Sequence, residues 1–159
     1  MLLLAEIIFV IWQQIGRITY LSDKLNSNSQ SQTETPTMSV EEIKRNTLTI
    51  SYDELMRNNE LYTGKIVYYR GRVLQVSEVY VNGDEYILRV ATKHDRYLDS
   101  YYDDVIWVNY RGHRLLEDDI IIVWGRVEGR KTYESVMGGY ITIPEVTALY
   151  LELARKAGY

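Results

Sequence analysis

Two strand-like segments of the sequence each carry a glycine inside an apolar run, and this feature restricts the possible folds most. "KIVYYRGRVLQVSEVY" (65–80) has Gly71 near its centre, and "IIIVWGRVEG" (120–129) has Gly125. A glycine inside a strand allows the sharp coiling or the bulge that a small barrel requires. Three further segments have strand patterns, at 86–92, 103–110 and 139–153. Five such strands predict a mainly all-β domain closed into a barrel, because closure removes the edges that an open sheet exposes.

The segments between these strands carry turn and loop signals. "VNGDE" (81–85) contains the Asn-Gly pair that favours a hairpin turn. Residues 93–102 and 129–139 are predicted to form loops, the first polar and aromatic, the second with glycines at both ends. Pro144 cannot donate a backbone hydrogen bond, so it indicates a sheet edge or a break in the fifth strand.

The corner before the fourth strand combines two leucines with three acidic residues. We expect Leu115 and Leu116 to plug the end of the barrel. Glu117, Asp118 and Asp119 are expected to turn the chain and to stay in solvent. Gly125 then lets the fourth strand bend where it crosses the first.

A short helix is predicted just before the first strand. Ser51 followed by Glu54 matches a capping box, in which a serine hydroxyl and a glutamate satisfy free backbone N–H groups at a helix start. Asn58, Asn59 and Gly64 end this helix after about two turns.

The chain divides into three predicted parts, namely an apolar N-terminal helix (1–22), a flexible linker (23–49) and the barrel domain with its short helix (50–159). The linker is rich in Ser, Asn, Gln and Thr, and such a segment cannot bury enough apolar surface to offset its ordering entropy. This layout is typical of a tethered domain.

The N-terminal helix presents apolar side chains for a membrane or for assembly, at Leu3, Leu4, Ile7, Ile8, Ile11, Trp12 and Ile15. A spanning helix needs about 20 apolar residues, and Glu6, Gln13, Gln14 and Arg17 interrupt this run. A signal anchor, a membrane-surface helix, an assembly helix and a helix docked on its own domain all remain open. Glu6 would also be fifth after loss of Met1, as in pilin-like filament subunits. We expect a membrane-anchored or cell-surface protein with an extracytoplasmic domain.

Composition excludes several classes of site. The chain has no cysteine, so disulfides, thiolate nucleophiles and cysteine-ligated metals are ruled out. Only two histidines are present, His94 and His113, and no nucleophile elbow or phosphate-loop spacing accompanies them. We therefore predict no enzymatic activity, no catalytic residue, no metal and no cofactor. The net charge of −4 disfavours binding of nucleic acid by bulk charge.

The globular part resembles a known family. "GKIVYYRGRV" and "LLEDDIIIVWGRVEG", taken together with the other strands over roughly residues 50–153, look like the tRNA-anticodon-like OB-fold domains of exported or membrane-tethered proteins. The resemblance implies a five-stranded OB barrel and names no ligand. Members often carry a lipid-attachment cysteine before the tether, and this sequence does not.

OB barrels commonly bind single strands or sugars across their second and third strands. Such a face needs cations along the path of a ligand and aromatic rings that stack on it. The candidate residues for this face are Arg70, Arg72, Arg89, Lys93, Arg96, Tyr97, Tyr101, Tyr102, Trp107 and Arg111. The aspartates interleaved with them, and the good fit of Tyr and Trp to any strand, favour an ordinary solvated surface as the alternative.

The sequence thus leads to a non-enzymatic OB-fold binding or structural module. Our leading hypothesis is that it is tethered or part of a surface assembly and acts through protein–protein contacts, including self-association. Tyrosine-rich surfaces suit such contacts because they bury a large area at low entropy cost. The alternatives are a single-stranded nucleic-acid-binding protein and a pilin-like filament subunit with the N-terminal helix as its packing core.

Overall fold

The computed structural model describes residues 38–79 and 84–158. The predicted N-terminal helix, residues 23–37 of the predicted linker and the Asn-Gly pair at 82–83 lie outside the described residues. Four short elements precede the barrel, α2 (Val40–Arg45), β1 (Thr47–Leu48), α3 (Tyr52–Arg57) and α4 (Asn59–Tyr62). Five long strands follow, β2 (Ile66–Val79), β3 (Glu85–Asp95), β4 (Ser100–Arg111), β5 (Ile120–Glu134) and β6 (Tyr140–Arg155).

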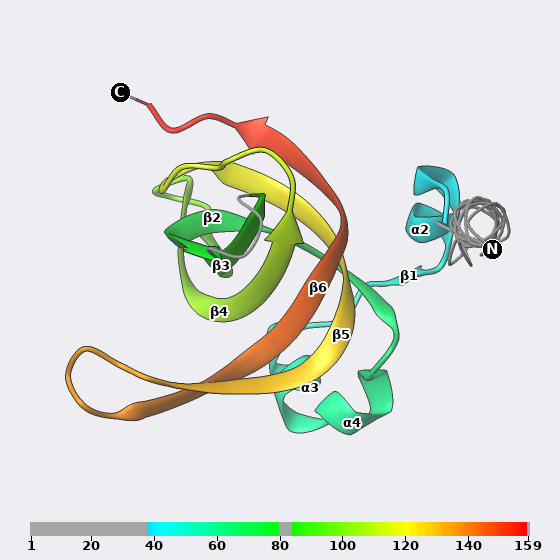
Figure 1. Ribbon diagram of the computed structural model, residues 1–159, viewed down its shortest axis with the longest axis horizontal. Coiled ribbons are helices and arrows are strands. Elements are labelled where there is room, and N and C mark those ends of the chain that lie inside the picture. The colour runs from blue at the N-terminus through cyan, green and yellow to red at the C-terminus, as the bar shows by residue number, and fades with distance from the viewer. Residues whose placement is uncertain (1–37, 80–83, 159) are drawn as a thin grey trace, which may run out of the picture. The chain divides into compact units, whose positions relative to one another are not determined.

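The five long strands close into a barrel in the order β2-β3-β4-β6-β5, with β5 pairing back to β2 (Figure 1). β4 and β6 are parallel, and the other barrel pairs are antiparallel. This closed, mixed, five-stranded arrangement is OB-like and confirms the predicted barrel. β1 pairs in parallel with Ile66 and Val67 at the start of β2. β3 pairs with β2 only from Arg72 onwards.

The inward faces of the strands form one core. Val67, Leu88, Ile106 and Val146 are fully buried there and come from four different strands. Alternate side chains point into the barrel because successive residues of a strand face opposite sides of the sheet. Leu55 of α3 is fully buried against the same cluster. The helix predicted before the first strand therefore contributes the Leu55 side chain to the core.

The structure shows one of the two hydrogen bonds of the predicted capping box. Ser51 precedes α3, and its Oγ accepts a hydrogen bond from the Glu54 backbone N–H at 3.2 Å. The Glu54 carboxylate does not return the bond to Ser51. It accepts hydrogen bonds from the Tyr62 hydroxyl at 2.8 Å and the Asn58 amide at 3.1 Å, which ties α3 to α4.

The two strand glycines sit where backbones come close. A Cβ at Gly71 would overlap the carbonyl oxygen of Ala91 and lie 2.7 Å from Val90 Cγ1, so β2 crosses β3 at a distance that only glycine permits. A Cβ at Gly125 would lie 3.0 Å from Val146 Cβ on β6. The β5–β6 register shifts between Trp124 and Gly125, which is a bulge. The sequence predicts a bend where this strand crosses the first, and Gly125 does pair with Val67 of β2, but its close contact is with β6.

Three segments differ from their predicted form. Residues 38–49, expected to be linker, contain α2 and β1, because Ser39 and Glu42 form a complete capping box that starts a helix. Residues 93–102, expected to be one loop, are mostly strand, and only 96–99 turn the chain. Residues 129–139 are likewise mostly strand. These strand ends carry mostly exposed polar residues. They lack the apolar side chains from which a strand is predicted in a sequence.

The corner at 115–119 also differs from the expectation. Leu115 is buried in the core as predicted, but Leu116 is 46% exposed and plugs nothing. Asp119, expected in solvent, is only 5% exposed. Its carboxylate accepts backbone N–H groups from Leu116 at 2.9 Å and Ala157 at 2.8 Å, so it fastens the C-terminal residues to this corner. These hydrogen bonds compensate its burial.

α2 lies against the outside of the barrel. Ile43 packs there with Ile66 and Trp124 in a second small cluster. The Lys44 ammonium lies 4.5 Å from the Trp124 ring centroid and 2.8 Å from a Glu152 carboxylate oxygen. α2 is thus held to β5 and β6 by apolar packing, a cation–π contact and an ion pair.

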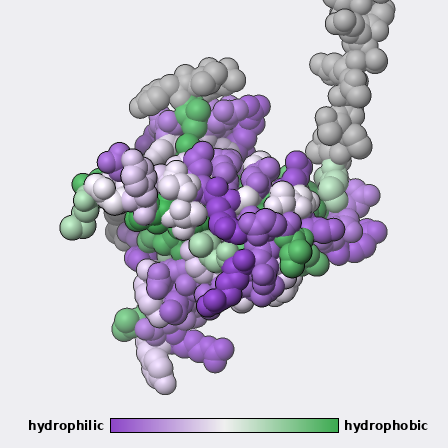
Figure 2. All heavy atoms as spheres, turned by 90° about the horizontal axis from the view of Figure 1, so that it is seen from below, coloured by the Kyte–Doolittle hydropathy of each residue, from purple (hydrophilic) through white to green (hydrophobic). Residues whose placement is uncertain are grey.

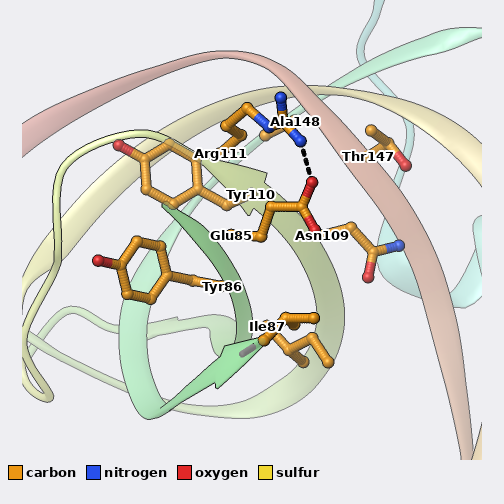
Figure 3. A pocket seen from close by; sticks show the side chains of 9 residues that line it. Glu85, Tyr86, Ile87, Asn109, Tyr110, Arg111, Thr147 and Ala148 are labelled. Carbon is orange, nitrogen blue, oxygen red and sulfur yellow. Dashed lines mark hydrogen bonds and ion pairs between the residues drawn. The ribbon is translucent and has the colours of Figure 1, made fainter. Parts of the chain in front are cut away.

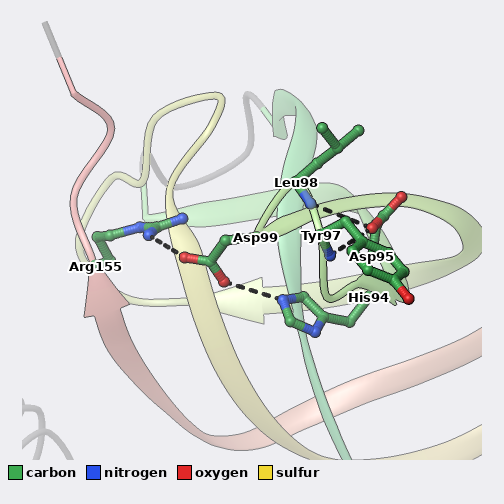
Figure 4. A network of polar contacts seen from close by, with 6 residues as sticks. All are labelled: His94, Asp95, Tyr97, Leu98, Asp99 and Arg155. Atoms are coloured by element: carbon green, nitrogen blue, oxygen red, sulfur yellow. Dashed lines mark hydrogen bonds and ion pairs between the residues drawn. The ribbon is translucent and has the colours of Figure 1, made fainter.

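The turn between β3 and β4 is stabilised by carboxylates (Figure 4). Asp95 Oδ1 accepts the backbone N–H groups of Tyr97 and Leu98 at 2.8 and 3.2 Å. Asp99 accepts hydrogen bonds from His94 Nε2 at 3.1 Å and Arg155 Nη1 at 3.2 Å, which joins this turn to the end of β6.

The surface is predominantly polar. Figure 2 shows a face on which hydrophilic side chains prevail and hydrophobic ones form small separate patches. Within residues 38–79 and 84–158, no helix has the length and apolar character needed to cross a membrane.

Candidate ligand-binding groove

One face of the β3–β4 pair carries three cross-strand pairs in a row. Directly opposite each other lie Glu85 and Arg111, Ile87 and Asn109, and Arg89 and Trp107. The residues between them, such as Leu88 and Val108, are fully buried in the barrel. The three pairs therefore form its outer surface, because side chains alternate along each strand.

A two-stranded hairpin arm extends beyond the barrel beside this surface. We use "arm" for Arg130–Glu134 of β5 and Tyr140–Pro144 of β6, with the turn 135–139 between them (Figure 1). Tyr133 on the arm lies 5.5 Å from Trp107, measured between ring centroids, with the rings tilted by 42°. Arg89 Nη1 donates a hydrogen bond of 3.0 Å to the Tyr133 hydroxyl. The arm thereby turns a flat strand surface into a groove.

The groove has a volume of about 360 Å³. Its lining comes from β2, β3, β4 and the arm, and consists of Gln75, Ser77, Ile87, Arg89, Trp107, Tyr133, Glu134, Ser135 and Val136. Amide, hydroxyl and guanidinium groups thus surround aromatic and aliphatic surface. Such a mixture is typical of a site that holds a ligand by stacking and apolar contact and orients it with a few polar groups.

Two cations lie over the aromatic rings of the groove. The Arg89 guanidinium carbon is 5.4 Å from the Tyr133 centroid, and the Lys131 ammonium is 5.5 Å from the Trp107 centroid. Both contacts are within cation–π range. Arg89 Nε is buried and has no hydrogen-bond partner among the described residues. A buried donor without a partner costs free energy, so this position of the Arg89 side chain is maintained at some energetic cost.

The Trp107 ring is held in place by a short polar chain. Its Nε1–H donates to Asn109 Oδ1 at 3.2 Å, and the Asn109 amide donates to Glu145 Oε1 at 2.9 Å. Glu145 is the β6 residue that lies opposite Trp107 where β4 and β6 pair. The ring is thus positioned before any ligand arrives, which lowers the entropy cost of binding.

A second hollow of about 410 Å³ lies further along the same strands (Figure 3). Ile87 lines both hollows, so they adjoin. Tyr86 and Tyr110 stack here with centroids 6.2 Å apart, and Arg111 forms ion pairs with Glu85 and Asp84. Together the two hollows offer a path across β3 and β4 that suits an extended ligand.

The region beside the groove is acidic. Burial raises the pKa of Tyr52, and the carboxylates of Asp104 and Asp103 also raise it because they disfavour a phenolate, so that together they bring it to about 12. Burial also raises the pKa of Asp104 above its ordinary value. Carboxylates at the start of β4 therefore give this end of the groove a negative potential, which repels a polyanion.

The structure brings together only part of the candidate face. Arg89, Trp107 and Arg111 share one surface of β3–β4. Lys93 and Tyr102 lie further along the same pair, where Lys93 bridges to Asp103 at 3.9 Å.

The remaining candidates lie elsewhere. Arg70 and Arg72 are on β2, and Arg72 pairs with Asp118 at 3.3 Å. Arg96 and the fully exposed Tyr97 are in the β3–β4 turn, and Tyr101 is only 8% exposed in a small cluster with Ala91. The Tyr101 side chain is therefore packed inside the protein and leaves little surface for a ligand.

Sequence reasoning missed the arm side of the groove. The sequence pattern places Lys131 and Tyr133 in a loop, where Tyr133 either contacts a partner or covers the barrel end, and it gives no signal at Gln75 and Ser77. The alternation Lys131, Tyr133 within a β-rich run was the available signal, but its contact with Trp107 depends on the tertiary fold.

Comparisons with known proteins give the chain no family. No protein-family model matches it, and no curated protein matches it. Among solved structures, one match is a crystal structure described as a candidate aspartyl-tRNA synthetase from Leishmania major Friedlin, with a TM-score of 0.44 and 12% identity. The match covers 81% of this chain and 23% of that protein, so the chain spans less than a quarter of its length.

Proposed function

We propose that the chain is a non-enzymatic OB-fold binding module that holds an extended segment of a protein partner in the groove between the β3–β4 face and the arm. The observation that carries this proposal is the Trp107–Tyr133–Arg89 cluster. Trp, Tyr and Arg are the residue types that dominate binding energy in protein interfaces, and here they line one partly enclosed surface.

Charge favours a protein segment over a nucleic-acid strand. A strand of phosphates needs several free cations along its path. On this molecule Arg72, Lys93 and Arg111 each face a carboxylate instead. The chain also carries a net charge of −4. A polypeptide needs only a few hydrogen bonds and one or two side-chain pockets. The groove offers Gln75 and Ser77 beside the rings of Trp107 and Tyr133.

Site-specific photo-crosslinking in the full-length chain tests the proposal. A crosslinker at position 75, on the groove floor, should trap a partner protein, and one at position 97, in the exposed β3–β4 turn, should not. Trp107→Ala should reduce trapping at least about tenfold, as expected for a central aromatic contact. Tyr97→Ala, an exposed aromatic outside the groove, is the matched control.

The alternative ligand is a single-stranded nucleic acid. An oligonucleotide titration at about 50 mM salt tests it, because phosphate contacts are strongest at low salt. We expect no binding. Binding that Trp107→Ala abolishes and that weakens steeply with salt would replace the protein ligand with a single-stranded nucleic acid.

We further propose that the apolar N-terminal segment attaches the domain to a membrane or to a surface assembly. The support is its sequence alone, with Leu3, Ile7 and Ile11 at helical spacing. Full-length protein should stay with membranes after an alkaline carbonate wash. Replacing Ile7 and Ile11 by lysine should release it, and release of the unchanged protein by the wash would exclude membrane insertion.

A further inference from the structure

Two cations at the groove have no carboxylate partner in the part of the chain that the structure describes. Neither Arg89 nor Lys131 forms an ion pair with a residue of 38–79 or 84–158. The Arg89 guanidinium donates instead to the uncharged Tyr133 hydroxyl at 3.0 Å. Both side chains are half-buried, and both contact aromatic rings, at 5.4 and 5.5 Å. Their positive charges can therefore pair with an anion that enters the groove.

The neighbouring cations differ from these two. On β3, on β4 and on the arm, the other lysine and arginine side chains already have carboxylates, in the pairs Lys93–Asp103, Arg111–Glu85 and Arg130–Glu60. Ion pairing is thus the rule on this surface of an acidic protein, and the groove is the exception to it. Two unpaired cations attract one anionic group, but they are too few for a strand of phosphates.

The two cations surround a single pair of rings. Arg89 lies opposite Trp107 on β3 and over the Tyr133 ring, and Lys131 lies over Trp107. The ring centroids of Trp107 and Tyr133 are 5.5 Å apart. An anion here lies beside apolar surface that excludes part of the water, where a charge-assisted hydrogen bond is stronger than in open solvent.

Negative charge in the groove lining is confined to one position. Among the described residues that line the groove, only Glu134 is acidic, and it is exposed at the end of β5. Its side chain starts from the opposite face of the strand to that of Tyr133, because successive residues alternate. Glu134 therefore leaves the space at the two rings open to another carboxylate.

We propose that the groove recognises an Asp or Glu side chain of the partner segment, with its carboxylate between Arg89 and Lys131 and an adjacent apolar side chain against Trp107. This inference rests on the proposed function, because it names the chemistry of the segment that the groove holds. The guanidinium has further N–H donors besides the one that it gives to Tyr133, and the Lys131 ammonium has three.

The surroundings select for a single acidic residue and not for a run of them. Asp103 and Asp104 at the start of β4 repel further carboxylates at that end of the groove. In the other direction the groove adjoins the second hollow through Ile87, so the segment has room to continue past the anion. The recognised carboxylate is therefore that of a side chain within the segment.

Peptide selection with the full-length chain in mild detergent tests the proposal. The probe is a library of random linear peptides displayed on phage. Peptides that bind the unchanged protein and do not bind Trp107→Ala should carry an Asp or Glu beside an apolar residue. One such peptide is then synthesised with an amidated C-terminus, so that only its side chain supplies the carboxylate.

Fluorescence anisotropy of this peptide measures the role of the two cations. Changing its acidic residue to the matching amide should weaken binding to the unchanged protein about tenfold, the effect of one hydrogen bond to a charged group. The same change should have almost no effect with a variant that carries both Arg89→Gln and Lys131→Gln. A purely structural role of the two residues would weaken the acidic and the amide peptide equally, so this cycle separates the two roles.

Lys131→Gln alone leaves the hydrogen bond between Arg89 and Tyr133 in place. It should already reduce the preference for the acidic peptide at least about threefold. Arg130→Gln is the matched control, since Arg130 is the neighbour of Lys131 on the arm and its guanidinium already pairs with Glu60. The preference should be unchanged in that variant.

The remaining outcomes separate this inference from the proposed function. Trp107-dependent peptides without an acidic residue overturn the inference and leave the binding module intact. A selection that yields no Trp107-dependent peptide overturns both. A preference for the acidic peptide that survives the double substitution, or that Arg130→Gln reduces as much as Lys131→Gln does, also overturns the assignment to Arg89 and Lys131.

Discussion

At the scale of single residues, Asp99 illustrates how a surface carboxylate joins two distant parts of the chain. Hydrogen bonds from His94 and then Arg155 hold the pKa of Asp99 below its ordinary value of 3.8. The folded state therefore binds the proton more weakly than the unfolded chain does. This contribution to stability is complete above about pH 4 and is lost as the pH falls through the lowered pKa of the folded state.

Asp99→Asn should therefore destabilise the protein slightly at neutral pH, and by less as the pH falls below about 4. The effect is small because the Asp99 side chain is 74% exposed. Asparagine tolerates the positive φ of 43° at this position, so the backbone is kept. Urea unfolding of both proteins at pH 7 and at about pH 2 measures the change in stability, and a difference that does not shrink at the lower pH contradicts this assignment.

At the scale of elements, the crossing of β2 and β3 at Gly71 fixes how the barrel curls. Gly71→Ala would drive a methyl group into the Ala91 carbonyl oxygen. We expect a loss of more than about 3 kcal/mol in the free energy of unfolding, because backbone cannot move aside as a side chain can. Gly139→Ala is the control, since its Cβ would meet only Ser135 Oγ at 3.7 Å. Denaturant unfolding of both variants measures the effect, and equal stability would show that the crossing adjusts.

The elements that could be predicted from the sequence are those with buried alternation. β2 and β5 were marked by apolar runs with an internal glycine, and α3 by Ser51 and Glu54. The arm was not predicted, because Arg130–Glu134 is polar and half exposed, and only the folded chain shows that Tyr133 meets Trp107. Ser39 and Glu42 have the same spacing as Ser51 and Glu54, but the polar residues before them dominate the composition, so the sequence predicts a linker where α2 forms.

At the scale of the whole molecule, α3 and the barrel should unfold together. Leu55 is fully buried and packs in the same core as the strands. Leu55→Ala should lower the free energy of unfolding by roughly 2–5 kcal/mol, as for other buried leucines. Leu61→Ala, at a largely exposed position of α4, should change it by less than about 0.5 kcal/mol. Circular dichroism and tryptophan fluorescence should give coincident transitions, and separate ones would make α3 an independent appendage.

The parallel pairing of β4 with β6 spans only Trp107–Asn109 against Glu145–Thr147, whereas β5 and β6 pair along most of their length. This is the shortest strand pairing of the barrel, so we expect brief thermal opening to start there. Trp107 stands at the first of these three positions, so an occupant stacked on its ring would clamp the seam shut. We therefore expect that binding of a ligand in the groove makes the barrel as a whole more rigid.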